Sequence, residues 1–394
     1  MPVTRRGQGV GMPPPLVRMA RMGLIVLVTL LAACAQPGAL APRRPGGAGA
    51  TDAADAANAA PAANLADAPA PLAWPGPPEP ARISWERSIS RPADLGLTRS
   101  FLQRLGDLLF GAPEERMVRP MAVVALDRVL FVADPGVRGV HRFDPVAGTY
   151  RLLRLEDGRE LPSPVGLARC GSSVVVSDSS RGELLVVDAT TDYARVVPLP
   201  ERSGQSGPAG RPERPSQPTG VACDATGARL FVSDTAGHRI LTYRRVAPSA
   251  PWLFDHSFGT RGGAPGEFNY PTYLWWDGAR LLVSDSLNFR VQAFDPDGRF
   301  LSVFGGPGDG AGDSARPKGV ATDSAGHVYV VDALFHAFQI FDRAGQLLLG
   351  VGARGSGPGE FWLPTGISIE RDEILVADSY NSRVQVFRYH GGEP

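Results

Sequence analysis

A pattern of hydrophobic and polar residues recurs six times between residues 118 and 390. Each copy opens with Pro, any residue, usually Gly, and then aliphatic residues. The six openings begin at Pro120, Pro164, Pro218, Pro271, Pro317 and Pro364. An apolar run follows each opening and ends, 14 to 16 residues after the Pro, at Asp134, Asp178, Asp234, Asp285, Asp332 and Asp378. So regular a spacing indicates one structural unit repeated six times.

Each unit has the pattern of four β-strands. The runs before the Asp are short, β-branched and apolar on both faces, as expected for strands that are covered on two sides. Alternating segments such as 290–294 come next, and turn sequences such as 295–298 precede a fourth strand. Four strands in 40 to 50 residues are typical of a propeller blade. We therefore predict an all-β fold, a six-bladed β-propeller of four-stranded antiparallel blades.

The last unit supplies only three strands, over residues 365–369, 373–377 and 383–389. Residues 81–90 alternate apolar and polar side chains, with Ile83 and Trp85 on one face. A strand here would complete the last blade and remove an unpaired sheet edge. We expect residues 81–394 to form one closed propeller, with 81–90 as an N-terminal latch strand.

Apolar residues between the latch strand and the first blade recur near helical spacing. They are Phe101, Leu102, Leu105, Leu108, Leu109 and Phe110. This pattern predicts a short helical connection over residues 95–115. Such a helix either covers one end of the central channel or packs at the seam between the last and first blades, and the sequence leaves both open.

Residues 1–33 have the pattern of a secretory signal peptide. Four Arg and no acidic residue precede an apolar run over 23–33, which is shorter than the ~20 residues that a membrane-spanning helix needs. Leu31-Ala-Ala-Cys34 resembles the lipobox of bacterial lipoproteins. The resemblance implies that Cys34 is acylated, for example with palmitate, and becomes the mature N-terminus. It favours export to the outer membrane with the protein facing the periplasm, the cell surface being the alternative.

The segment 34–80 begins with this Cys and is mostly Ala, Pro and Gly. It has no periodic apolar face and cannot bury enough apolar surface to offset the entropy lost on ordering. We therefore predict a disordered tether whose ends lie on the order of 40 Å apart. The predicted propeller would then stand off the membrane that holds its lipid anchor.

Three units share a more specific motif, in which an Arg follows the Asp by five residues. The pairs are Asp234 and Arg239, Asp285 and Arg290, and Asp378 and Arg383. With the glycine-rich links 259–268 and 352–361, these segments resemble the NHL-repeat family of β-propellers. The other units have Gly139, Glu183 and Ala337 in place of the Arg. Because such an Asp can pair with the Arg across a turn and accept backbone N–H groups, we interpret the pairs as structural.

Charge and motifs restrict the function. Lys plus Arg and Asp plus Glu number 40 each, a balance that disfavours the basic surface of a nucleic-acid-binding protein, so we expect no nucleic-acid partner. The six His show no metal-binding spacing, and no nucleophile elbow, phosphate loop or Cys-x-x-Cys occurs. We therefore predict no metal or cofactor and assign no catalytic residue.

The resemblance to propellers implies that the loops at one end of the ring are candidates for binding. Tyr273 replaces the usual Gly, and Lys318, the single Lys of the chain, lies beside Arg316. The predicted binding face consists of Arg119, Tyr270, Tyr273, Arg316, Lys318, His238, His336, Asn288 and Asn381. A solvated or structural role is the alternative for each.

Cys170 and Cys223 follow the first strands of adjacent units. A disulfide between them is conceivable in an oxidising compartment, but Cys is often buried as a free thiol. We expect two buried free thiols.

Two functions stay open. The first, which we favour, is a membrane-anchored, monomeric cell-envelope scaffold that presents its loops to an envelope protein or another ligand. The second is a propeller enzyme with its site in the central channel, because the resemblance extends to peptide-amidating lyases, which use channel histidines and a divalent metal, and to lactonase-type rings. Three or more His or carboxylate side chains that converge in the channel would favour the enzyme.

Overall fold

The computed structural model of the chain describes residues 72–97, 115–155, 157–188, 193–197 and 217–391. The predicted signal peptide, Cys34 and the tether up to residue 71 lie outside the described residues. Most of the predicted helical connection, from 98 to 114, also lies outside them.

The described residues form an almost entirely β structure. Their helical elements are three short 3-10 turns, η2 (Pro92–Leu95), η4 (Ser286–Asn288) and η5 (Ser379–Asn381). No helix within the described ranges has the length and apolar character needed to cross a membrane. The strands of the first three units are β3 (Ala122–Leu126), β4 (Val129–Asp134), β5 (Gly139–Asp144), β6 (Thr149–Leu155), β7 (Pro164–Cys170), β8 (Ser173–Asp178), β9 (Glu183–Asp188), β10 (Tyr193–Val196), β11 (Pro218–Cys223), β12 (Arg229–Asp234), β13 (Arg239–Arg244) and β14 (Leu253–Phe258).

The later units follow the same order of four strands, except that the last one borrows its outer strands from the N-terminal side. The remaining strands are β15 (Pro271–Trp276), β16 (Leu281–Asp285), β17 (Arg290–Phe294), β18 (Phe300–Phe304), β19 (Pro317–Thr322), β20 (Val328–Asp332), β21 (Ala337–Phe341), β22 (Leu347–Val351), β23 (Ile367–Glu370), β24 (Glu373–Asp378), β25 (Arg383–Tyr389), β1 (Ala73–Trp74) and β2 (Ile83–Ile89).

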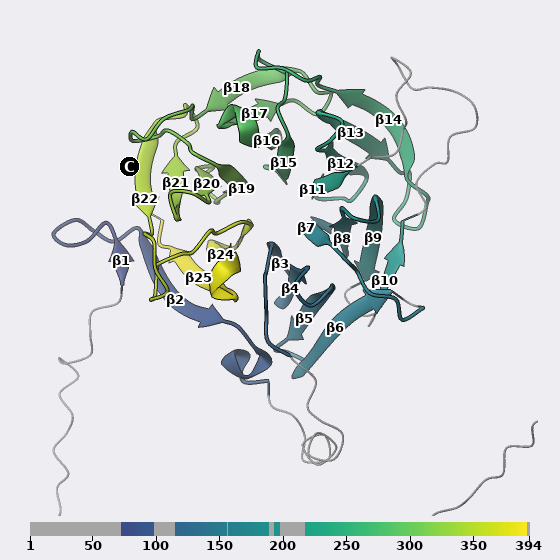
Figure 1. Cartoon of the computed structure of the whole chain (residues 1–394), viewed down its shortest axis with the longest axis horizontal. Coiled ribbons are helices and arrows are strands. Elements are labelled where there is room, and N and C mark those ends of the chain that lie inside the picture. Colours follow the sequence, from purple (N-terminus) through teal and green to yellow (C-terminus); the bar gives the residue numbers. More distant parts are fainter. Residues whose placement is uncertain (1–71, 98–114, 156, 189–192, 198–216, 392–394) are drawn as a thin grey trace, which may run out of the picture. The chain divides into compact units, whose positions relative to one another are not determined.

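The strands pair into antiparallel units, or blades, that stand side by side around a centre (Figure 1). A short parallel pairing between the outer strands β6 and β10 joins blades 1 and 2 into one eight-stranded sheet. The innermost strands contact one another in the order β3, β7, β11, β15, β19 and β23, and β23 contacts β3 again. The blades therefore close into a ring, and the prediction of an all-β propeller with antiparallel four-stranded blades is confirmed.

The N-terminal strand completes the last blade, as predicted. β2 pairs antiparallel with β25, with Ile83 opposite Tyr389 at one end and Ile89 opposite Val384 at the other. The Trp85 Nε1–H donates to Gln385 Oε1 at 2.9 Å. β1 adds a fifth strand by pairing with β2. Because β1 lies within the segment 34–80, the prediction of a disordered tether is wrong at its end. The Trp74 ring packs 5.9 Å from Phe387, so this segment has apolar surface to bury.

Aromatic side chains fill the seams between blades. Phe268 and Phe361, which end the two glycine-rich links, are fully buried, and each packs against a Phe of the following blade, Phe294 or Phe387. Gly352 lies against the Phe361 ring with φ of 108°, where a Cβ would approach that ring to 2.6 Å. The links are therefore glycine-rich because the backbone passes directly over a buried ring.

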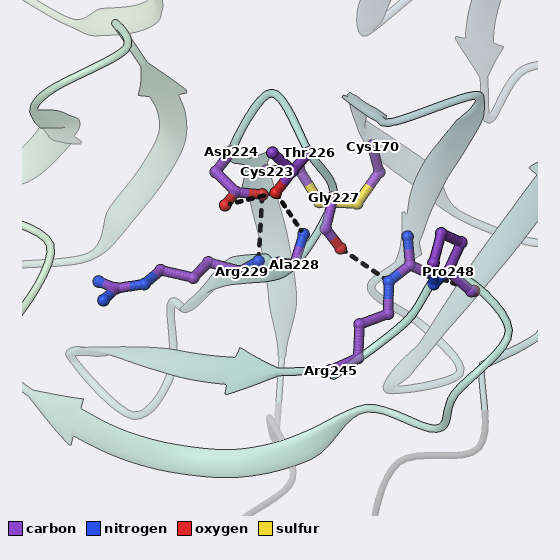
Figure 2. Close-up of a disulfide and its surroundings, with 9 residues drawn as sticks. All are labelled: Cys170, Cys223, Asp224, Thr226, Gly227, Ala228, Arg229, Arg245 and Pro248. Atoms are coloured by element: carbon purple, nitrogen blue, oxygen red, sulfur yellow. Dashed lines mark hydrogen bonds between the residues drawn. A yellow bond between two sulfur atoms is a disulfide. The ribbon is translucent and has the colours of Figure 1, made fainter.

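A disulfide joins Cys170, at the end of β7, to Cys223, at the end of β11 (Figure 2). The expectation of two free thiols is therefore wrong. The innermost strands of adjacent blades run so close together that the two Cα atoms are 5.2 Å apart, which is within the usual range for a bridge.

The Asp that ends the second strand of every blade is fully buried and accepts a hydrogen bond from a backbone N–H about 16 residues upstream. The donors belong to the loop that leads into the innermost strand, which we call the leading loop. They are Val118 (2.7 Å), Ser163 (3.2 Å), Gln217 (3.1 Å), Asn269 (2.7 Å), Ala315 (2.7 Å) and Trp362 (2.8 Å). Each carboxylate thus holds a leading loop against the turn between the second and third strands.

Arg completes this arrangement where the motif has one. Arg239, Arg290 and Arg383 lie 2.8 to 2.9 Å from their Asp carboxylates. The Arg290 guanidinium also donates to the carbonyls of Gly263, Ala264 and Glu267. One Arg therefore joins the buried Asp to the glycine-rich link.

In blade 1 a His takes the place of the Arg as the partner of the buried Asp. His141 lies on β5, fully buried, with its Nε2 3.3 Å from Asp134 Oδ2 and its Nδ1 2.9 Å from the Tyr150 hydroxyl. Burial acts to raise the pKa of Asp134, but hydrogen bonds from His141 and from the Val118 N–H outweigh it and hold the pKa below its ordinary value.

Hydroxyl groups beside the Asp connect blades 2, 3, 4 and 6 to the blade that follows. In blade 3, Ser233 and Thr235 donate to the carbonyls of Thr272 (2.5 Å) and Pro271 (2.6 Å) at the start of β15. The other donors are Ser177, Ser179, Ser284, Ser286 and Ser379. The Asp thus fixes loops within a blade while its neighbours join adjacent blades.

Deleting residues 81–90 should open the ring, because it exposes the hydrogen-bonding edge of β25. We expect a lower unfolding midpoint and aggregation, measured by thermal unfolding and size-exclusion chromatography. A synthetic peptide of residues 72–91 should restore both properties by refilling the edge. An unchanged midpoint and elution volume in the deletion variant would contradict closure by this strand.

Asp285→Ala should destabilise the propeller by roughly 3–5 kcal/mol, because it leaves Arg290 without its buried partner. The measurement is chemical unfolding of this variant beside Arg159→Ala. Arg159 belongs to an exposed pair with Asp157, so its loss should leave the unfolding midpoint unchanged. Equal effects of the two substitutions would show that the buried Asp has no special role.

Candidate binding face

The predicted binding residues lie in the leading loops and in the turns between second and third strands, or next to them. Both kinds of loop lie at the end of the ring where the innermost strands begin, and the buried Asp residues hold them together. We call this end the leading face.

Three side chains form an exposed cluster at the seam between blades 6 and 1. The Arg119 guanidinium lies over the Tyr380 ring, 5.4 Å from its centroid, and Trp362 lies 5.7 Å from the same ring. Tyr380 is 50% exposed and Trp362 44% exposed. This group, which we call the Trp362 cluster, combines two aromatic rings with a cation at a solvent-accessible site.

The backbone beneath the Trp362 cluster is firmly held. The Trp362 N–H donates to Asp378, the Tyr380 N–H donates to the Trp362 carbonyl, and the Arg119 N–H donates to Asp134. Arg119 was predicted for this face. Trp362 was missed because it resembles a core residue in the sequence, and only its exposure reveals it.

His238 and His336 occupy equivalent positions in blades 3 and 5. Both adopt a left-handed backbone, with φ of 51° and 55°. The Nδ1 of His238 accepts from the Tyr270 N–H at 3.3 Å, and that of His336 accepts from the Leu363 N–H at 3.1 Å. Burial, and then the charge of Arg354, lower the pKa of His336. The two imidazoles therefore link one blade to the leading loop of the next.

Asn288 and Asn381 also repeat one contact. Each donates its side-chain N–H to the buried Asp of its own blade, Asp285 or Asp378, at 2.8 Å. Each also donates to a carbonyl of the glycine-rich link, at Gly262 or Gly355. These amides hold the loops together, so they stabilise the leading face.

Tyr273 crosses the ring. It lies on β15 of blade 4, and its hydroxyl donates to the Met121 carbonyl beside β3 of blade 1 at 2.9 Å, on the opposite side of the centre (Figure 1). Burial raises the pKa of Tyr273 above its ordinary value, although a hydrogen bond with Thr365 opposes this. The side chain thus lies across the central channel.

Arg316 and Lys318 flank Pro317 at the start of β19. Arg316 is exposed, and its N–H donates to Asp332 at 2.9 Å. Burial, and then the neighbouring Arg316 charge, lower the pKa of Lys318. The nine predicted residues therefore do not form one common site. Some are exposed, some connect one loop to another through hydrogen bonds, and Tyr273 lies across the channel.

No group of three or more His, Cys, Asp or Glu side chains with the geometry to hold a metal ion occurs in the part of the chain that the structure describes.

Comparisons with known proteins give a consistent picture. The family model described as NHL repeat matches residues 361–387. The RING finger protein nhl-1 of Caenorhabditis elegans is 41% identical over 66 residues, which are 16% of this chain and 7% of that protein. The chain thus matches only a small part of that relative's length.

Two solved structures from Bacteroides thetaiotaomicron have the same fold. A protein of unknown function has a TM-score of 0.52 at 15% identity over 70% of both chains. A protein described as an auxiliary nutrient binding protein has a TM-score of 0.51 at 12% identity over 71% of both chains. Together with the ring of antiparallel blades, these structures identify the fold as a β-propeller, and residues 361–387 of this propeller match the NHL repeat.

Proposed function

We propose that this propeller is a lipid-anchored scaffold of the bacterial cell envelope and that it holds a protein partner against its leading face. The observation that carries the proposal is the Trp362 cluster. Trp, Tyr and Arg are the residues most often found at the energetic centre of protein interfaces. Here all three lie together and exposed on one rigid end of the ring.

Hydrogen bonds fix the backbone of the Trp362 cluster, and this favours tight binding of a partner. Association costs less when side chains do not have to be ordered first, and the backbone of all three residues is already fixed by buried hydrogen bonds. Val118, next to Arg119, adds a 44% exposed aliphatic side chain to the same seam. A partner could therefore bury an apolar patch with a cation at its edge.

The sequence supports the envelope location through the apolar run and Leu31-Ala-Ala-Cys34. The Cys170–Cys223 disulfide supports it too, because disulfides persist in oxidising compartments such as the periplasm and the cell surface. The alternative of a channel enzyme stays a prediction, and no specific contact among the described residues favours it.

Trp362→Ala should abolish partner binding without changing stability. A photo-crosslinking amino acid at Tyr380 should give a crosslinked product in intact bacteria, and the product should disappear when Trp362→Ala is added. Leu301→Ala is the matched control, because Leu301 is 49% exposed on the outer strand β18. Identical crosslinked products with and without Trp362, or none in the parent, would contradict the proposed interface.

Cys34→Ser should abolish lipid attachment, because serine lacks the thiol that accepts the acyl group. The measurement is incorporation of labelled palmitate into the full chain in growing bacteria. The Cys170→Ser variant is the control, since that Cys lies in the disulfide and should leave labelling unchanged. Continued incorporation in Cys34→Ser would exclude the anchor while leaving the interface test unaffected.

A further inference from the structure

The central channel is closed between its two ends. Glycines near the start of the innermost strands let adjacent backbones touch: a Cβ on Gly166 would lie 2.0 Å from the Thr219 carbonyl oxygen, and one on Gly220 would lie 2.0 Å from that of Thr272. Blade 4 has Tyr273 at this level, and its hydroxyl reaches the opposite side of the ring. A cavity of only about 30 Å³ remains there.

A larger pocket, of about 380 Å³, lies beyond this level, where the innermost strands end. We call it the trailing pocket, because it lies at the end of the ring opposite the leading face. Every blade contributes to its wall. The apolar lining includes Leu167, Val221, Leu274, Trp275, Trp276 and Ile369. The volume is within the range of small-molecule sites, which is about 300–1,000 Å³.

Fixed contacts hold the walls of the trailing pocket. The Trp275 Nε1–H donates to the Thr322 hydroxyl at 2.9 Å, and Trp276 stacks on Phe231. Cys223 lines the pocket, and its disulfide to Cys170 fixes the ends of two innermost strands (Figure 2). The pocket is therefore formed in advance of any binding.

Charged side chains gather at the mouth. Asp224 and Asp277 line it, and Arg169 extends from β7 to Glu370 of β23 at 2.9 Å. Asp224 is oriented by the Thr226 hydroxyl and the Arg229 N–H in a tight turn (Figure 2). Among the described residues that line this pocket, Arg169 is the one cation, and it pairs with Glu370; of the two carboxylates, Asp277 pairs with Arg280 at 2.7 Å and keeps further acceptor sites. The mouth therefore offers mainly hydrogen-bond acceptors to an incoming molecule.

We infer that the trailing pocket binds a small amphiphile. An apolar ring or short chain would lie against the aliphatic walls and the two Trp rings, and a hydroxyl or ammonium head would donate hydrogen bonds to the acceptors at the mouth. An anionic head is disfavoured, because the described lining presents carboxylates to it, and the one cation of that lining is already paired with Glu370. This site is separate from the leading face and does not depend on the partner proposed for it.

Three probes with the same apolar body test the inference: cyclohexylmethylamine, cyclohexylmethanol and cyclohexanecarboxylate. Each is titrated into the protein, with binding followed by intrinsic Trp fluorescence and by the thermal unfolding midpoint. The amine and the alcohol should bind and raise the midpoint, and the carboxylate should bind at least about tenfold more weakly. Equal binding of all three, or binding of none at millimolar concentration, would overturn the inference.

Variants locate the binding. Leu167→Ala should weaken binding of the alcohol at least about fivefold, because it removes apolar surface from the wall. Its matched control is Leu348→Ala, at a 46% exposed Leu of the outer strand β22. Trp275→Ala should also weaken binding of the alcohol, because Trp275 lines the trailing pocket. Its control is Trp362→Ala, at the opposite end of the ring, which should leave binding unchanged. Binding that is unchanged by Leu167→Ala, or lost in either control, would show that the probes bind elsewhere.

Discussion

The buried Asp at the end of the second strand is the group on which the rest of this propeller depends. The oxygens of a carboxylate that is buried away from water need hydrogen-bond donors. Here the donors are backbone N–H groups of a leading loop about 16 residues upstream. Because the same loop leads into the innermost strand, this contact fixes where each blade begins. In blades 2, 3, 4 and 6, neighbouring hydroxyls then join the blade to the next one.

This arrangement explains why the two ends of the ring differ. The leading face is built from loops held by Asp, Arg, Asn and His, so exposed side chains such as Trp362 stand on rigid backbone. The trailing end consists of short turns around a pocket whose walls are strand ends and a disulfide. Tyr273 separates the two by lying across the channel. The two ends of the ring therefore differ in structure, and each carries one of the two binding sites that we propose.

The strand order, the closure by residues 81–90 and the repeated Asp could be predicted, because each leaves a periodic pattern in the sequence. Other features could not. The disulfide depends on how closely adjacent innermost strands approach, which a separation of 53 residues does not reveal. β1 has only two residues, too few for a pattern. Tyr273 was recognised as unusual, but its contact with Met121 exists only once the ring has closed.

Hydrogen exchange of the native protein is the most direct test of the role of the buried Asp residues. We expect the backbone N–H groups bonded to these residues, such as those of Asn269 and Trp362, to exchange as slowly as amides of the innermost strands, although they belong to loops. Exchange of these amides as fast as that of exposed turns would contradict this expectation, because the Asp contacts would then open without unfolding of the ring.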